Sequence, residues 1–196
     1  IRKLLPNVPV LALTATATPE VVKDIQQKLE FKKGSNVFRM SFERKNLAYI
    51  VRPTENKQEE LLHILHSVSG SAIVYTRNRK RTREVAELLT NNDITATFYH
   101  AGLNNDVKDI RQKSWLTGEH RVMVATNAFG MGIDKPDVRF VVHYDIPKSL
   151  EGYYQETGRA GRDGGEGQCI CFYSPKDIER LRKFQQGKPI AEQEIS

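Results

Sequence analysis

The sequence predicts an α/β fold in which helices cover a parallel β-sheet. Short runs rich in β-branched and aromatic residues alternate with amphipathic helical patterns along most of the 196 residues. Consecutive parallel strands need a crossover connection, usually a helix, so this alternation favours a parallel sheet. The length suits one domain with its own core plus a short additional segment, and no apolar run is long enough to cross a bilayer.

The first 40 residues differ from the rest. They predict one strand, residues 8–13, and one helix, residues 19–29, capped by Thr18. A single β-α unit cannot bury both of its faces, so we expect residues 1–40 to end a neighbouring domain and residues 41–196 to form the main one. Residues 35–46, polar and basic without periodicity, are the expected linker. The chain begins with Ile1 and not with Met, so we expect a fragment of a longer protein.

Five strands are expected in the main domain, separated by helices with one apolar face. The strands are residues 71–76, 95–99, 121–126, 138–143 and 168–173. Apolar residues recur at helical spacing in the first two intervening segments. These residues are Leu61, Ile64, Leu65 and Val68, followed by Val85, Leu88 and Leu89. Ser174, Pro175 and Asp177 resemble an N-cap, a first-turn proline and an acidic third residue, which predicts a final helix ending at Gly187.

Several residues that resemble functional signals have simpler explanations. Val107, Ile110 and Trp115 are expected to form a helix face in the core and not a platform for stacking bases. Four histidines lack partners at ligand-like spacing and are expected in packing or surface roles. They are His63, His66, His120 and His143.

Charge and cysteine content narrow the function only slightly. Thirty Lys and Arg against 24 Asp and Glu give a net charge of +6, which suits a polyanionic partner without identifying one. Cys169 and Cys171 lie in an expected buried strand, and two thiols are too few for a four-ligand structural zinc site. We therefore expect reduced core cysteines, no bound metal and a cytoplasmic protein.

The segment QETGRAGRDG, residues 155–164, carries the clearest chemical signal. Arg159 and Arg162 stand among glycines, and six of the chain's 13 glycines lie between Gly152 and Gly167. A guanidinium binds phosphate oxygens through two parallel hydrogen bonds, and glycines allow the backbone to approach closely. The segment predicts a phosphate-facing loop; the alternative is a flexible surface turn with incidental arginines.

This segment resembles motif VI of the RecQ family of DNA helicases, within superfamily 2. Four further segments resemble the family's motifs III, IV, a following signature and V, in the family's order. They are LTATAT (13–18), IVYTRNR (73–79), YHAGL (99–103) and VATNAFGMGIDKPDVR (124–139).

The resemblance implies a RecA-like fold, a doubly wound parallel sheet with helices on both faces, preceded by the end of a first RecA-like domain. ATP would bind between the two domains. Arg162 would be the arginine finger that faces the γ-phosphate, with Arg159 assisting. Gly132 and Asp134 would lie near the nucleotide, Asp134 beside the ribose or coordinating the arginines; a capping or salt-bridging role in its own loop is the alternative for Asp134.

The resemblance also implies DNA contacts near the start of the helix after residue 76 and at two other turns. The residues concerned are Arg77, Asn78, Arg79, His100 and Thr126. Arg77 and Asn78 depart from the usual family form of motif IV. Five cations crowd this helix start, where the helix dipole disfavours them, so an anionic partner would stabilise them. For Lys80, Arg81 and Arg83 the alternative is an ordinary solvated basic face.

Two motifs that hydrolysis requires are missing from this chain. It has no GxxxxGK[ST] phosphate loop and no Asp-Glu dipeptide. The resemblance implies that the full-length protein uses ATP and Mg²⁺, whereas the missing motifs predict that this chain alone neither hydrolyses ATP nor holds it stably. The implied activity is 3′ to 5′ unwinding in the cytoplasm or nucleus, with single-stranded DNA, duplex DNA and the first RecA-like domain as partners and no membrane association.

Two alternative functions remain. One is an RNA helicase of the same superfamily, although such relatives usually carry His-Arg in place of Gln155-Glu156. The other is a non-enzymatic nucleic-acid-binding adaptor that keeps the motor motifs as relics.

Overall fold

The computed structural model describes residues 7–14, 17–32, 34–39, 41, 43–130 and 133–186, with backbone alone for 180, 181 and 183–186. The chain divides into two compact units, Ile1–Arg44 and Lys45–Ser196. Each unit is described by itself.

The smaller unit contains one helix, α1 (Pro19–Lys28). The Thr18 hydroxyl accepts a hydrogen bond from the Val21 amide at 3.4 Å, which confirms the expected cap. The strand expected at residues 8–13 is wrong, since none is formed in the described stretch 7–14. Its apolar residues are open to solvent, with Leu11 80% and Leu13 83% exposed. A strand needs a paired strand for its backbone hydrogen bonds, and none of the described residues of this unit lies in a strand.

The larger unit is built on a six-stranded sheet. Along the chain its strands are β1 (Leu47–Pro53), β2 (Ser71–Tyr75), β3 (Ala96–Tyr99), β4 (Val122–Ala125), β5 (Val138–His143) and β6 (Gly167–Tyr173). Their order in the sheet is β1-β6-β5-β2-β4-β3, and every adjacent pair is parallel. The five expected strands and the parallel sheet are confirmed. The sequence analysis missed β1, an edge strand whose residues after Leu47 are mostly exposed, so its sequence lacks a core-facing pattern.

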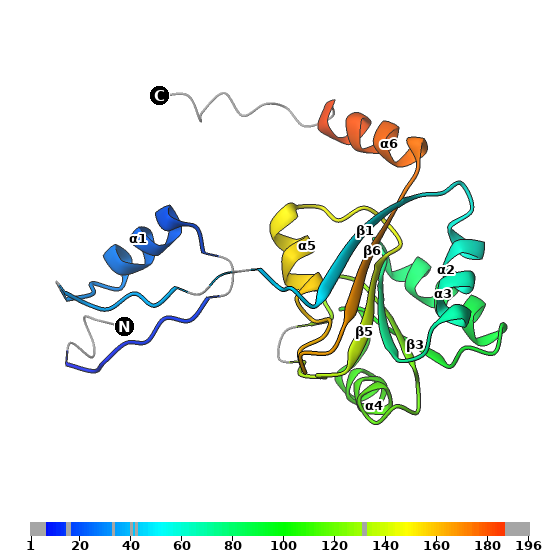
Figure 1. Cartoon of the computed structure of the whole chain (residues 1–196), viewed down its shortest axis with the longest axis horizontal. Helices are drawn as coiled ribbons and strands as arrows, with labels where there is room; N and C mark the ends of the chain where they lie inside the picture. Colours follow the sequence, from blue (N-terminus) through cyan, green and yellow to red (C-terminus); the bar gives the residue numbers. More distant parts are fainter. Residues whose placement is uncertain are drawn as a thin grey trace. The chain divides into compact units, whose positions relative to one another are not determined.

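Helices cover both faces of this sheet (Figure 1). On one face, α2 (Lys57–Ser67) and α3 (Arg79–Thr90) bury Leu61, Leu65 and Leu89 completely. On the other, α4 (Asn105–Leu116) and α5 (Leu150–Thr157) lie beside a second apolar cluster. Successive residues of a strand point to opposite faces of the sheet, so Val74 packs in the apolar cluster under α2 and α3 and Ile73 packs in the cluster on the other face.

The helix faces agree with the sequence except at α4. Leu61, Ile64, Leu65, Val85 and Leu89 are buried as expected. Trp115 is also fully buried, and its Nε1 donates to the Ala72 carbonyl at 3.2 Å, but Ile110 is 67% exposed. Five residues along an α-helix turn the side chain by about 140°, so Ile110 and Trp115 cannot share one face. The expected core role of Ile110 is wrong.

The chain continues from β6 into α6 (Pro175–Gln186). The Ser174 hydroxyl and amide donate to Asp177 Oδ2 at 2.8 and 3.1 Å, which confirms the predicted start of this helix. Gly187, its expected end, lies outside the described residues. Over the described part of the chain, none of the helices has the length and apolar character needed to span a membrane.

Replacing one buried leucine tests this packing. Leu89→Ala should lower the free energy of unfolding by about 2 to 5 kcal/mol, because it opens a cavity where the side chain is 0% exposed. Leu150→Ala is the matched control: this leucine is 70% exposed, and its loss should cost less than about 0.5 kcal/mol. Urea denaturation of both variants measures the difference, and equal midpoints would contradict the assigned core.

Candidate functional site

The arginine loop, residues 158–165, begins where α5 ends and is fastened to the sheet. The Gly161 amide donates to the Val138 carbonyl at 2.8 Å, next to the start of β5. Asn46, the residue before β1, donates from Nδ2 to the carbonyls of Gly161 and Gly165 at 2.8 and 2.7 Å. Gly161 has a φ of +55°, and a Cβ there would lie 2.5 Å from the Gly165 oxygen. A side chain at position 161 would therefore strain this turn, which explains the glycine there.

A second fastening comes from an ion pair between Arg139 on β5 and Asp163 in the loop. Arg139 Nη1 also donates to the Glu166 carbonyl at 3.1 Å, and the Gly165 amide donates to Asp163 Oδ1 at 2.9 Å. The hydrogen bond from Arg139, followed by that from Gly165, holds the pKa of Asp163 below its ordinary value. Asp163 therefore remains ionised at neutral pH and keeps the turn closed.

Arg159 points into the domain. Its Nη1 donates to the Gly130 carbonyl at 2.5 Å, which joins the end of α5 to the loop after β4. Tyr75 lies beside it and donates its hydroxyl to the Phe129 carbonyl at 3.2 Å. Burial raises the pKa of Tyr75 despite the opposing charge of Arg159, so Tyr75 stays a neutral donor. Within the described residues, the buried Arg159 Nε has no hydrogen-bond partner.

Arg162 is the more accessible of the two arginines. Its Nη1 donates to the Ile133 carbonyl and to Asp134 Oδ1, both at 3.1 Å. The side chains are 35% exposed for Arg162 and 82% exposed for Asp134. An exposed ion pair of this kind adds little stability, so the guanidinium can exchange its partner for another anion at small cost. Gly132, expected near the nucleotide, lies outside the described residues.

The residues expected to contact DNA follow three neighbouring strands. Arg77, Asn78 and Arg79 come after β2, His100 after β3 and Thr126 after β4. These strands are adjacent and parallel, so their carboxyl ends share one edge of the sheet. The Thr126 amide donates to the Tyr99 carbonyl at 3.2 Å, which ties two of these ends together. We call these five residues the carboxyl-end cluster.

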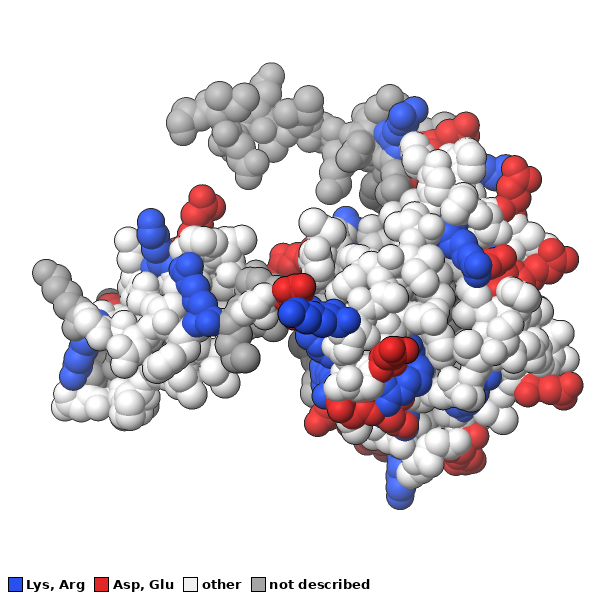
Figure 2. Space-filling view, in the orientation of Figure 1, with Lys and Arg blue, Asp and Glu red and all other residues white. Residues whose placement is uncertain are grey.

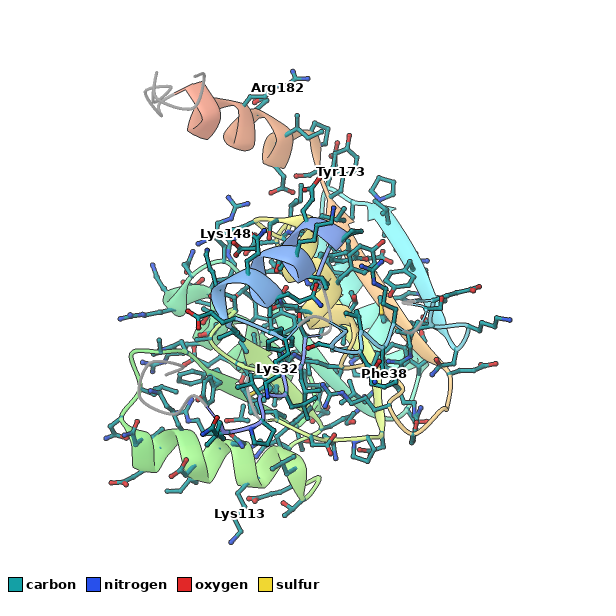
Figure 3. The ribbon with its side chains drawn as sticks, turned by 90° about the vertical axis from the view of Figure 1, so that its left-hand side faces the viewer. Lys32, Phe38, Lys113, Lys148, Tyr173 and Arg182 are labelled. Atoms are coloured by element: carbon teal, nitrogen blue, oxygen red, sulfur yellow. The ribbon has the colours of Figure 1, made fainter. Side chains whose placement is uncertain are left out.

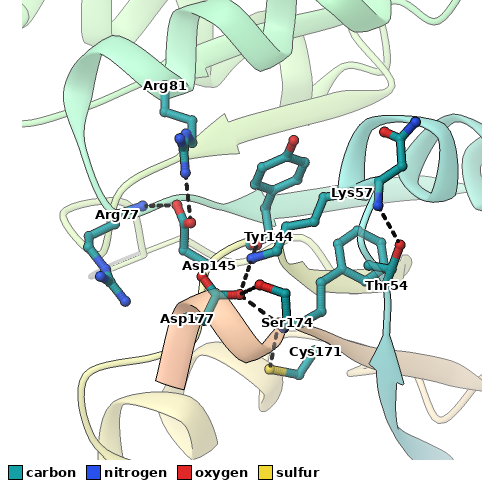
Figure 4. A network of polar contacts seen from close by, with 11 residues as sticks. Thr54, Lys57, Arg77, Arg81, Tyr144, Asp145, Cys171, Ser174 and Asp177 are labelled. Carbon is teal, nitrogen blue, oxygen red and sulfur yellow. Dashed lines mark hydrogen bonds and ion pairs between the residues drawn. The ribbon is translucent and has the colours of Figure 1, made fainter. Parts of the chain in front are cut away.

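Asp145 organises one side of the carboxyl-end cluster, a role that the sequence analysis missed. This carboxylate is 4% exposed and accepts hydrogen bonds from the Arg77 amide and from Arg81 Nη1, each at 2.9 Å (Figure 4). Asn78 caps α3, with its Oδ1 accepting from the Arg81 amide at 2.8 Å. The Asn78 amide oxygen is therefore already engaged within the protein.

Three of the five cations at the start of α3 have acidic partners. Arg81 pairs with Asp145 at 2.9 Å, Lys80 with Glu84 at 3.6 Å and Arg83 with Glu87 at 2.7 Å. These contacts favour the interpretation of Lys80, Arg81 and Arg83 as an internally compensated basic face. On the face drawn in Figure 2, basic and acidic side chains are likewise interspersed. In the part of the chain that the structure describes, Arg77 and Arg79 make no ion pair.

Arg79 reaches over the turn that follows β3. A Cβ on Gly102 would lie 2.6 Å from Arg79 Nη1, so the glycine leaves room for the guanidinium. His100 stacks on Phe98, with ring centroids 5.8 Å apart. Burial, followed by the charges of Arg79 and Arg111, lowers the pKa of His100. His100 is therefore a neutral imidazole at neutral pH, able to donate or accept a hydrogen bond.

A second polar contact in Figure 4 ties three elements together. Lys57 Nζ on α2 donates to the Tyr144 carbonyl after β5 and pairs with Asp177 on α6, both at 2.8 Å. The Lys57 and Asp177 side chains are 13% and 5% exposed. Burial alone would raise the pKa of Asp177, but hydrogen bonds from Lys57 and Ser174 outweigh it and lower the pKa. No local sequence pattern pairs Lys57 with a residue 120 positions away.

Comparison with known proteins identifies similar sequences. A family model described as helicase conserved C-terminal domain matches residues 56–164. The RecQ-like DNA helicase blm-1 of Caenorhabditis elegans is 48% identical over 91% of this chain and 18% of its own length. The ATP-dependent DNA helicase RecQ of Bacillus subtilis is 46% identical over 86% of this chain and 29% of its own length. A putative ATP-dependent RNA helicase of Acanthamoeba polyphaga mimivirus is 44% identical over 93% of this chain and 34% of its own length.

The chain thus spans between 18% and 34% of the length of these curated relatives. Among solved structures, Saccharomyces cerevisiae Dbp5 bound to RNA and ADP BeF3 has a TM-score of 0.69. It is 22% identical, and the match covers 88% of this chain and 47% of that chain. This likeness concerns the fold alone, and it confirms the expected RecA-like sheet with helices on both faces.

The contact between Lys57 and Asp177 predicts a pH dependence of stability. The pKa of a free aspartate is about 3.9, and in the folded protein the pKa of Asp177 is lower. Such a carboxyl group stabilises the fold at pH values above the unfolded pKa. This stabilisation is lost as the pH falls through the folded pKa. Asp177→Asn should therefore cost about 1 to 3 kcal/mol at neutral pH and flatten the stability curve below about pH 4. Urea denaturation across this range measures both effects. Asp109→Asn, an exposed aspartate on α4, is the control; parallel curves for wild type and Asp177→Asn would contradict the assignment.

Proposed function

Because the chain belongs to the helicase conserved C-terminal domain family and to its RecQ-like DNA helicases, we propose that it is the second motor domain of an ATP-dependent DNA helicase. Residues 1–40 close the first motor domain in this proposal, and residues 41–196 form the second. The division of the chain between Arg44 and Lys45 supports this assignment. The full-length protein unwinds duplex DNA in the 3′ to 5′ direction, using ATP and Mg²⁺.

The geometry of Arg162 carries the proposal. The arginine loop is fastened at Gly161 and Asp163, yet the Arg162 side chain remains 35% exposed beside an acidic residue at the surface. A rigid backbone with an exchangeable guanidinium suits an arginine finger, which stabilises negative charge on the transferring phosphoryl group. Arg159 assists by linking the arginine loop to Gly130 in the loop after β4.

The residues present fit one side of an ATP site. Arg162 would face the γ-phosphate with Arg159 assisting, and Asp134 would lie near the nucleotide. Gly132, expected there as well, lies outside the described residues. ATP supplies the phosphoryl group, and its Mg²⁺ neutralises part of the phosphate charge. The phosphate-binding loop and the Asp-Glu pair that this sequence lacks would come from the first domain. The chain alone therefore neither holds ATP stably nor hydrolyses it.

The carboxyl-end cluster would bind the backbone of single-stranded DNA. Arg79 makes no ion pair among the described residues, and it lies next to the neutral His100. The α3 N-terminus adds the positive end of a helix dipole, and Thr126 lies at the same edge of the sheet. Phosphate contacts of this kind position a strand without reading its sequence.

RNA is the second candidate substrate. The similar mimivirus protein is named a putative RNA helicase, although the other two relatives are named DNA helicases. Phosphate contacts do not distinguish the two nucleic acids, because recognition of RNA depends on the 2′-hydroxyl. Stimulation of hydrolysis by each polymer separates the candidates.

ATP hydrolysis by the full-length protein tests the role of Arg162. Single-stranded DNA should stimulate the wild type, and Arg162→Ala should lower the stimulated rate by about 10³-fold or more, since the guanidinium is lost from the transition state. Arg182→Ala, an exposed arginine on α6, is the matched control and should retain the wild-type rate (Figure 3).

Three outcomes of this assay have distinct meanings. Stimulation by RNA alone would replace DNA as the proposed substrate. Undiminished hydrolysis by Arg162→Ala would show that Arg162 is not the finger. An unchanged unwinding rate together with undiminished hydrolysis would favour the non-enzymatic adaptor for this domain.

The salt dependence of binding tests the carboxyl-end cluster. About four phosphate contacts to single-stranded DNA should give a log-log slope of binding constant against salt near −3. Arg79→Ala should reduce the size of the slope by about 0.7 and weaken binding equally for different sequences. Lys113→Ala is the control, because Lys113 extends from α4 away from the sheet (Figure 3). Fluorescence anisotropy of this chain measures both slopes, and a salt-independent affinity would contradict the phosphate contacts.

A further inference from the structure

His143 is a buried histidine that the proposed function does not yet use. It is the last residue of β5 and is 1% exposed. Its Nε2 lies 2.7 Å from Glu156 Oε2 on α5, and the Glu156 side chain is 14% exposed. Glu156 stands three residues, nearly one helical turn, before Arg159 of the arginine loop. The contact therefore joins the centre of the sheet to the element that carries both arginines.

A second route leads from His143 to the same arginine. The imidazole stacks on Tyr75, with ring centroids 5.4 Å apart and an interplanar angle of 22°. The Tyr75 hydroxyl donates to the Phe129 carbonyl, and the next residue, Gly130, accepts from Arg159. His143 thus touches both structures that meet at Arg159: α5 through Glu156, and the loop after β4 through Tyr75.

The cost of this arrangement argues against a purely stabilising role. Burying a polar pair removes both groups from water, and well-packed apolar side chains are often as stable in such places. The second ring nitrogen, Nδ1, is buried without a hydrogen-bond partner among the described residues, which adds to the cost. An apolar residue would fill the space without these penalties, but it could not hold Glu156.

The position of α5 depends on such tertiary contacts. The helix has only eight residues, too few to be stable alone in water. It also leads directly into the arginine loop, so a small rotation of α5 would move both guanidinium groups. A displacement of about 1 Å at a reacting centre can cost about 10²-fold in rate.

We propose that His143 is a positioning residue, which acts through Glu156 to set the place of Arg159 and Arg162 for ATP hydrolysis. In this proposal His143 Nε2 donates the hydrogen bond to Glu156 Oε2, and neither residue contacts the reacting phosphate. This inference rests on the proposed role of Arg162 as the arginine finger.

Two substitutions of His143 distinguish the effect of its hydrogen bond to Glu156 from the effect of its ring packing against Tyr75. His143→Phe keeps an aromatic ring against Tyr75 but removes the donor to Glu156. His143→Gln loses the ring but places an amide nitrogen near the position of Nε2. In the full-length protein, His143→Phe should lower the DNA-stimulated kcat by about 10- to 100-fold, with the KM for ATP within about threefold of wild type. His143→Gln should recover kcat to within about threefold of wild type.

Further measurements exclude a general loss of structure. Affinity for single-stranded DNA should stay near the wild-type value in both variants, and both should remain folded at the assay temperature although the loss of the buried contact lowers the melting temperature. His66→Phe, at an exposed position on α2, should retain full activity. If His143→Phe fails to fold, Glu156→Met carries the test, since it removes the acceptor at a less buried position; a full kcat in that variant overturns the proposal.

Background substitutions show whether His143 acts through the arginine loop. In an Arg159→Ala background, adding His143→Phe should lower kcat by less than about threefold, because Arg159, where both routes from His143 meet and through which His143 acts on Arg162, is already absent. A multiplicative loss in that background, or an unchanged kcat for His143→Phe in the wild type, overturns the proposal. If Arg162→Ala abolishes hydrolysis while His143→Phe does not, only the positioning role fails. If Arg162→Ala retains hydrolysis, the proposed finger fails and this inference fails with it.

Discussion

The placement of α5 along β5 is the constraint on which the position of the arginine loop depends. The chain leaves the carboxyl end of β5, turns at Ser149 and returns as α5 on one face of the sheet. At one end of this path His143 holds Glu156, and at the other the Gly161 amide bonds to the Val138 carbonyl. Because both ends are attached to the same central strand, the arginine loop takes its position from the most deeply buried part of the sheet.

The two arginines of this loop have different surroundings in spite of their similar sequence context. Arg159 is drawn inward by the Gly130 carbonyl and lies beside Tyr75, whereas Arg162 pairs with the exposed Asp134. An inward arginine that bridges two segments is costly to displace, since its partners are shielded from water. An outward arginine in water can release its carboxylate at little cost. The pair therefore suits a division between one residue that orders the loop and one that meets an incoming anion.

The basic residues near the start of α3 also fall into two groups, those with an acidic partner within the domain and those without one among the described residues. Lys80, Arg81 and Arg83 find carboxylates within the domain, and Asp145 in particular holds the first turn of α3 from the end of β5. This internal pairing relieves the repulsion that five neighbouring cations and the helix dipole would otherwise produce. Among the described residues Arg77 and Arg79 make no ion pair, and Arg79 lies beside Gly102 in the turn after β3. A phosphate group of a ligand would give these arginines the anionic partner that the other cations find within the domain.

The sequence by itself determined the local elements and the chemical signals. Strand runs, helix faces and the caps at Thr18 and Ser174 follow from periodicity and from hydrogen bonds between near neighbours, which a linear pattern records. The glycines around Arg159 and Arg162 likewise mark a tight loop. Two local predictions failed: residues 8–13 form no strand within the described stretch 7–14, and Ile110 is turned away from Trp115.

Only the tertiary structure decided which distant residues meet. The edge strand β1 exists because it pairs with β6, 120 residues later, and Asp145, His143 and Lys57 acquired their roles from partners on other elements. The inward and outward directions of Arg159 and Arg162 also depend on the loop after β4. The physical reason is that sheet order and the packing of α5 bring these groups together, and no local spacing in the chain encodes that order.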